Sequence, residues 1–135
     1  MKKSMSIKLL LCCLIGFMNL NCESEEIPKV IELELGESHN GNGFAITFFS
    51  VKSDSRCPIG VTCVWAGNAE VAFTFENRLG VDSGFSLNTH SGNGFINDTL
   101  INGYRIKLLE VHPYPEKDKV INLDDYVAEI EISKE

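Results

Sequence analysis

Apolar residues recur at every second position along much of this chain, and this period limits the fold more than any other feature. Side chains that alternate between apolar and polar place one face of a β-strand against a core and the other in water. No stretch repeats at the 3.6-residue period of a helix over two turns. The strands expected on this basis cover residues 31–35, 44–51, 71–75, 85–87, 104–111 and 126–132.

Clusters of Gly, Asn and Pro separate these segments. About seven short strands without crossover helices predict an all-β fold, a single antiparallel β-sandwich (Ig-like or Greek-key) over residues 30–135, with a small barrel as the alternative. The apolar series changes parity at Phe48 and Phe49, which predicts a β-bulge there or a strand buried on both faces. Tyr126 enters the last strand after a turn, and its hydroxyl is expected to bond back to that turn as a tyrosine corner.

Residues 1–21 have the composition of a targeting segment. Lysines near the N-terminus precede an apolar run of about ten residues, whereas a membrane-spanning helix needs about 20. Cys22 and an acidic stretch follow, and this arrangement resembles a bacterial lipoprotein signal. The resemblance implies that Cys22 becomes the lipidated first residue of the mature chain, although Asn21 stands where that family has Gly, Ala or Ser. Residues 22–29 then form an acidic tether; the alternative is ordinary secretion with Cys22 unmodified.

The chain is acidic, with a net charge of −7 over 135 residues. Removal of residues 1–21 leaves 9 basic and 19 acidic side chains, a net charge of −10. Such a charge disfavours nucleic acid as a partner, because phosphate binding needs a basic patch. It also disfavours direct binding to anionic lipid, so attachment to a membrane would depend on the N-terminal lipid.

Two of the five cysteines, Cys57 and Cys63, lie in the expected mature domain. An even pair in an oxidising compartment predicts a disulfide, here closing a seven-residue ring. Chain entropy gives such a ring a stabilisation of about 2.4 kcal/mol. The spacing fits structural zinc poorly, and a redox pair is more often Cys-x-x-Cys, so a structural bridge is the favoured interpretation.

The segment around this pair is the candidate recognition loop, with Arg56, Pro58 and Trp65 as its notable residues. Trp65 is the chain's single tryptophan, and we expect its ring to pack on the disulfide; the alternative is a recognition anchor. Arg56 before Cys57 and Pro58 also fits the constrained loop of a protease inhibitor, presented by residues 55–62 to a trypsin-like pocket.

Motifs that carry catalysis are absent from the sequence, which contains no nucleophile elbow, phosphate loop, zinc-protease helix or dinucleotide fingerprint. We therefore expect a non-enzymatic protein with no cofactor and no metal. Residues 38–44 and 89–95 are similar, and His39 and His90 at matching positions suggest a weak metal or small-ligand site as an alternative. Ordinary Gly-Asn-Gly turns explain the similarity better and are the favoured interpretation. His112 is expected at a strand end without a ligand role.

Residues 54–58 (Asp-Ser-Arg-Cys-Pro) and 63–67 (Cys-Val-Trp-Ala-Gly) resemble a motif of small, uncharacterised exported bacterial proteins. Residues 104–115 and the last strand are also similar to that group, so the resemblance spans most of residues 30–133. It implies a secreted or lipid-anchored β domain and brings no activity with it. The sequence thus predicts a lipid-anchored protein of the bacterial cell envelope that acts by binding, or as an accessory, to an envelope protein.

Overall fold

The computed structural model describes residues 27–80 and 82–135. The expected signal segment, Cys22 and most of the expected tether therefore lie outside the described residues. Within those ranges no helix is long and apolar enough to cross a membrane. The strands are β1 (Lys29–Glu34), β2 (Ser38–Gly41), β3 (Phe44–Asp54), β4 (Ala69–Asn77), β5 (Asp82–Asn88), β6 (Asp98–Ile101), β7 (Tyr104–His112) and β8 (Val127–Lys134), with a 3-10 helix η1 (Leu123–Asp125) before β8.

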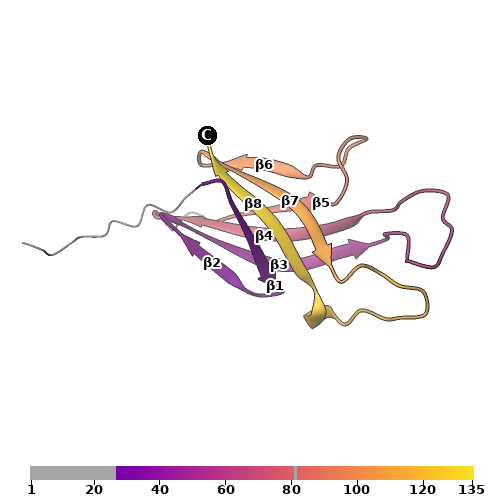
Figure 1. Ribbon diagram of the computed structural model, residues 1–135. Helices are drawn as coiled ribbons and strands as arrows, with labels where there is room; N and C mark the ends of the chain where they lie inside the picture. Colours follow the sequence, from indigo (N-terminus) through magenta and orange to yellow (C-terminus); the bar gives the residue numbers. More distant parts are fainter. Residues whose placement is uncertain (1–26, 81) are drawn as a thin grey trace, which may run out of the picture.

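The strands form two antiparallel sheets of four, ordered β1-β8-β7-β6 and β2-β3-β4-β5 (Figure 1). They face each other as a sandwich and do not close into a barrel, which confirms the predicted fold class. Within the two sheets, β1 and β8 are the one neighbouring pair that is not consecutive in the chain. Immunoglobulin domains have two such pairs, B–E and C–F, in their ABED and CFG sheets.

The core lies between the sheets and follows from the period-two pattern. Phe48 on β3 and Phe73 on β4 are at most 1% exposed, and their ring centroids lie 5.5 Å apart. Ile106 on β7 and Ile130 on β8 are fully buried in the same cluster. The alternating polar residues lie on the outer faces, as the sequence predicts.

Three register shifts, two in β3 and one in β7, interrupt the pairing of the strands. The register of β3 against β4 shifts between Phe48 and Ser50, which confirms the predicted bulge and leaves Phe49 63% exposed. The register of β7 against β8 shifts between Leu108 and Glu110, so Leu109 is the extra residue. Leu108 and Val111 both remain buried, because the extra residue moves the second half of β7 by one position.

The two short edge strands β2 and β6 were not expected from the sequence. Both are four residues long and too polar or too short to show a period. Each belongs to a tight hairpin, closed by Asn42-Gly43 between β2 and β3 and by Asn102-Gly103 between β6 and β7. Asn102 and Gly103 both have positive φ (51° and 80°), as a two-residue hairpin turn requires.

The long loops and the start of β1 lie at opposite ends of the sandwich (Figure 1). Lys29 at the start of β1 pairs with Ile132, near the Asn102-Gly103 turn that Glu135 also contacts. The β3–β4 and β7–β8 connections leave the sheets at the other end, beyond Asp54 and His112.

Candidate functional site: a braced loop with an apolar apex

The connection between β3 and β4, residues 55–68, is here called the bridged loop. The Sγ atoms of Cys57 and Cys63 lie at bonding distance, 2.15 Å, which confirms the predicted disulfide. Below the ring, the amides of Ser55 and Cys57 donate to the carbonyls of Asn68 and Ala66, each at 2.8 Å. These bonds extend the antiparallel pairing of β3 and β4 beyond the ends of the two strands, as far as the base of the disulfide ring.

The bridged loop is also braced against the β7–β8 connection. Ile59 N donates to Pro115 O and Lys117 N donates to Ile59 O, each at 2.9 Å. The resulting bridge between Ile59 and Glu116 is parallel. Because it joins one loop to another, this contact limits how far either loop can move alone.

A buried ion pair secures the first residues of the loop, and we call Asp54, Arg56 and Tyr126 the Arg56 clamp. Arg56 Nε and Nη2 donate to the two carboxylate oxygens of Asp54, at 2.9 and 2.6 Å. Tyr126 Oη donates to Asp54 Oδ2 at 3.1 Å. The Arg56 side chain is 5% exposed and that of Asp54 9%. A paired and hydrogen-bonded charge of this kind is the form in which charges are tolerated inside proteins.

Arg56 also joins the two sheets. Its Nη1 donates to the carbonyl of Val111, and its Nη2 donates to that of Pro113 at 3.0 Å. The guanidinium carbon lies 4.9 Å from the centre of the Tyr114 ring. One side chain from the β3–β4 loop thus satisfies backbone acceptors at the end of β7.

The clamp shifts the pKa values of its acidic members. Burial by itself would raise the pKa of Asp54, but the hydrogen bonds and positive charge of Arg56 outweigh it and lower the pKa below 3.8. Burial, followed by the negative charge of Asp54, raises the pKa of Tyr126 above 10.0. Asp54 is therefore ionised and Tyr126 neutral near pH 7.

Two sequence-based expectations are wrong at the clamp. Arg56 was expected to be an exposed loop residue. Its hydrogen bonds to backbone carbonyls of the fold instead hold it buried, at 6% relative exposure. Tyr126 was expected to bond to its own turn, but its hydroxyl reaches Asp54 at the end of β3. Sequence reasoning missed both contacts because the partners are 55 and 72 residues away.

Gly67 and Asn68 fix the other end of the bridged loop, where it returns to β4. Gly67 has a φ of +75°, and a Cβ atom there would lie 1.8 Å from the carbonyl oxygen of Ser55. Only glycine fits so close a backbone approach. Asn68 is buried and donates from Nδ2 to Asn88 Oδ1 at 2.8 Å, which ties the loop to the end of β5. Gly67, the last residue of the motif, and Asn68 after it therefore have structural roles.

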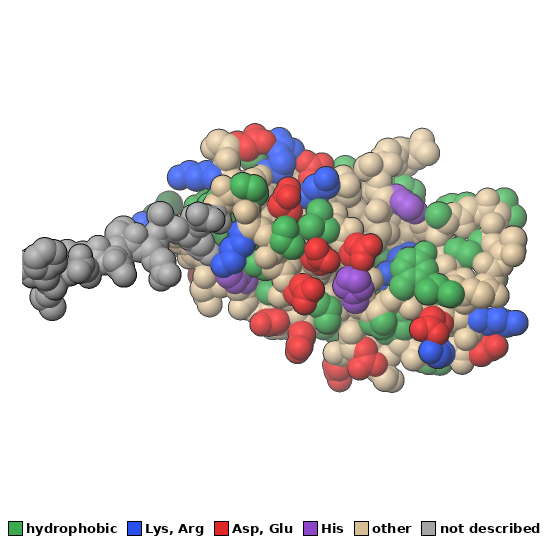
Figure 2. Space-filling view, viewed as in Figure 1, with side chains coloured by type: hydrophobic (Ala, Val, Ile, Leu, Met, Phe, Trp, Pro, Cys, Tyr) green, Lys and Arg blue, Asp and Glu red, His purple; other side chains and the backbone are tan. Residues whose placement is uncertain are grey.

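The apex of the bridged loop, residues 59–66, lies between the Arg56 clamp and Gly67 and is exposed. Every residue from 59 to 66 is exposed, and four of them have large apolar side chains: Ile59 (60%), Val61 (43%), Val64 (105%) and Trp65 (69%). Hydrophobic side chains are visible at this end of the molecule in Figure 2. The expectation that Trp65 buries its ring on the disulfide is wrong. Pro58 is half-buried at the foot of the apex.

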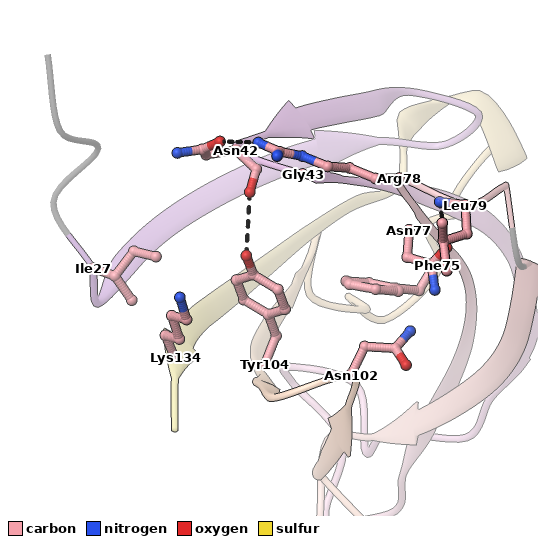
Figure 3. Close-up of a pocket in the computed structure, with 10 residues that line it drawn as sticks. All are labelled: Ile27, Asn42, Gly43, Phe75, Asn77, Arg78, Leu79, Asn102, Tyr104 and Lys134. Carbon is pink, nitrogen blue, oxygen red and sulfur yellow. Dashed lines mark hydrogen bonds between the residues drawn. The ribbon is translucent and has the colours of Figure 1, made fainter. Parts of the chain in front are cut away.

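A hollow of about 590 Å³ lies at the other end of the sandwich, where β1 enters the domain (Figure 3). Tyr104 forms part of its wall and donates from Oη to the carbonyl of Asn42 at 3.2 Å. Arg78 donates to the side-chain oxygen of Asn42 at 2.6 Å. None of the ten residues that line it carries a carboxylate.

A second hollow, of about 420 Å³, lies beside the bridged loop and is lined by Arg56, Tyr114, His90 and His112, among others. His39 lies on β2, at the opposite edge of its sheet from β5, which His90 follows. Three strand spacings, roughly 14 Å, separate those edges. The structure therefore does not bring His39 and His90 together as a metal site.

No family model, curated protein or solved structure shows significant similarity to the chain. The geometry of the described residues is accordingly the basis on which a function is proposed.

Proposed function

We propose that this protein is a lipid-anchored, non-enzymatic binding protein of the bacterial cell envelope that recognises a partner protein through the apex of the bridged loop. One observation supports this above all others. Trp65 and Val64 are 69% and 105% exposed on a loop that a disulfide, the Arg56 clamp and an inter-loop bridge hold in one conformation.

Exposed apolar side chains on a fixed loop favour binding for two reasons. A large aromatic residue supplies much contact area, and tryptophan is enriched among the residues that dominate interface energies. A loop already held in one shape loses little conformational entropy when a partner covers it. The apex is also uncharged, because residues 57–67 contain no acidic or basic side chain in a chain of net charge −7. A partner with an apolar groove is the complementary surface.

The position of the apex suits a tethered protein. The loop emerges from the far ends of β3 and β4, whereas β1 begins at the opposite end (Figure 1). β4 has nine residues, which span roughly 30 Å at about 3.3 Å each. An N-terminal lipid would therefore leave the apex pointing away from the bilayer, toward other envelope proteins.

The protease-inhibitor alternative loses its main support. A trypsin-like pocket would need the Arg56 side chain, which is 5% exposed and paired with Asp54 at 2.6 Å. Inserting it would break the clamp and leave the Asp54 carboxylate unpaired in a buried site.

The binding proposal is tested by capture from an envelope extract with the purified full-length chain as bait. Trp65→Ala and Val64→Ser should each release the captured partner, while Leu79→Ser should retain it. Leu79 is a matched control, because it is 86% exposed at the opposite end of the sandwich. A partner that binds all variants equally, or capture of none at all, contradicts the proposal for the apex.

The anchor is tested separately by mass spectrometry of the chain produced in a bacterial host with its N-terminus intact. A mature chain that starts at Cys22 with the added mass of a diacylglyceryl group supports lipidation, and Cys22→Ser should lose that mass and leave the membrane fraction. An unmodified, soluble product would refute the anchor without affecting the apex.

A further inference from the structure

A histidine and two glutamates converge on the outer face of the β1-β8-β7-β6 sheet. His112 Nε2 lies 3.3 Å from Glu110 Oε2 and 3.7 Å from Glu129 Oε2. One ligand atom from each of the three residues lies within 4.8 Å of the other two. Figure 2 shows acidic side chains gathered around one histidine on this face, near the loop end of β7 and β8.

The bulge in β7 creates this arrangement. Before the bulge, Lys107 faces outward and Leu108 is buried; without an extra residue, position 109 would face outward and Glu110 would face the core. The register shift at Leu109 turns Glu110 and His112 outward instead, with Glu110 directly opposite Glu129. Bulges often occur next to binding and active sites, where they redirect a side chain.

The carboxylates of the cluster lie opposite like charges on the neighbouring strands. Glu129 pairs with Glu110 on one side and with Glu32 of β1 on the other, which places three carboxylates in one row across three strands. Like charges directly opposite each other destabilise a sheet. A bound cation would offset that repulsion, and His112 supplies a donor that an ordinary acidic surface lacks.

The distances from His112 to the two glutamates suit a transition-metal ion. A tetrahedral ion with bonds of about 2.0–2.1 Å to imidazole and carboxylate ligands holds those atoms roughly 3.3–3.4 Å apart. The contacts of His112 at 3.3 and 3.7 Å are close to that value. Imidazole with carboxylate suits zinc and its neighbours, whereas calcium and magnesium prefer oxygen alone.

One side of the cluster is open. Glu110 and His112 also line the 420 Å³ hollow beside the bridged loop, together with His90, Thr89 and Tyr114. Three protein ligands beside a hollow correspond to a metal site that keeps a position for water or an exogenous ligand. We propose that Glu110, His112 and Glu129 bind one divalent transition-metal ion, such as Zn²⁺, with its free coordination position toward this hollow. This departs from the sequence-based expectation of no metal.

The test is calorimetric titration of the full-length, metal-free chain with Zn²⁺. We expect one ion per chain, and Glu129→Gln and His112→Ala should each weaken binding at least about tenfold. Glu131→Gln is the matched control, since it removes the same charge from the outer face of β8 outside the cluster; its affinity should change less than about twofold. Mg²⁺ should bind far more weakly than Zn²⁺.

Titration with Co²⁺ separates this site from the thiols, because a thiolate ligand adds a sulfur-to-metal charge-transfer band in the near ultraviolet. We expect visible bands without that feature, lost in His112→Ala. Absence of binding, binding unchanged in both cluster variants, or a thiolate spectrum would each overturn the proposal. None of these outcomes affects the proposed role of the apex.

Discussion

Replacing Arg56 by alanine should destabilise this domain more than any other loss of a charged side chain in its described part. The substitution leaves the Asp54 carboxylate without its ion-pair partner in a site where its side chain is 9% exposed. It also removes the side-chain donors that reach the carbonyls of Val111 and Pro113. Breaking a buried pair by removing one partner costs about 3–5 kcal/mol, much of it from the charge left behind.

The measurement is urea unfolding at 25 °C and pH 7, followed by tryptophan fluorescence and circular dichroism. With an m value of about 1.5 kcal/mol/M, a loss of 3–5 kcal/mol lowers the midpoint by roughly 2–3 M. Arg105→Ala is the control, because Arg105 is likewise ion-paired, with Asp98 and Glu135, but its side chain is 41% exposed. Exposed ion pairs contribute little to stability, so this variant should unfold nearly as the wild type does.

The double variant Asp54→Ala/Arg56→Ala supplies a second check. If the cost arises from the unpaired charge, removing both partners should destabilise the domain less than the sum of the two single variants. Equal losses for Arg56→Ala and Arg105→Ala, or strict additivity at the clamp, would refute the reasoning.

Three further predictions concern the same end of the molecule. Gly67→Ala should lower the free energy of unfolding by about 2–4 kcal/mol in thermal or urea unfolding, because its Cβ would meet Ser55 O at 1.8 Å. Gly36→Ala is the control and should cost only about 1 kcal/mol, because there is open space around Gly36. Similar losses in the two variants would contradict the steric argument. Cys63→Ser should lower the unfolding free energy by about 2.4 kcal/mol under oxidising conditions, and the reduced wild type should match it. Because the pKa of Asp54 is held below 3.8, its contribution is present above that pH and is lost as the pH falls through its native pKa. The stability difference between wild type and Asp54→Asn should therefore shrink in unfolding experiments run at successively lower pH below 3.8, and a constant difference would show that ionisation of Asp54 is irrelevant.

The outcome at Trp65 shows where local sequence reasoning fails. A tryptophan two residues after a cystine was expected to pack on it, yet the ring is 69% exposed. The sequence specifies that the loop is bridged, but not whether the sheets leave space beneath the bridge. In the structure the side chain that becomes buried is that of Arg56, which donates to the carbonyls of Val111 and Pro113.

The cluster around His112 shows a related limit. Its members lie on β7 and β8, separated along the chain by the whole β7–β8 connection, and only the register places Glu110 opposite Glu129. The sequence does contain a signal for it, since Leu108, Leu109 and Val111 change parity as Phe48 and Phe49 do. A bulge was predicted only at Phe48 and Phe49. The outward orientation of Glu110 and His112 was therefore not predicted.

The sequence by itself determined the fold class, the six main strands, the Asn- and Gly-rich turns between them, the change of parity after Phe48 and the Cys57–Cys63 bridge. Each of these depends on neighbours within a few residues: alternation selects the buried face, Asn and Gly accept positive φ, and a short ring closes locally. The tertiary structure decided the order of strands, the burial of Arg56, the exposure of Trp65 and the meeting of His112 with Glu129. These depend on which segments the two sheets bring side by side, and such contacts between distant residues leave no periodic trace in a single chain.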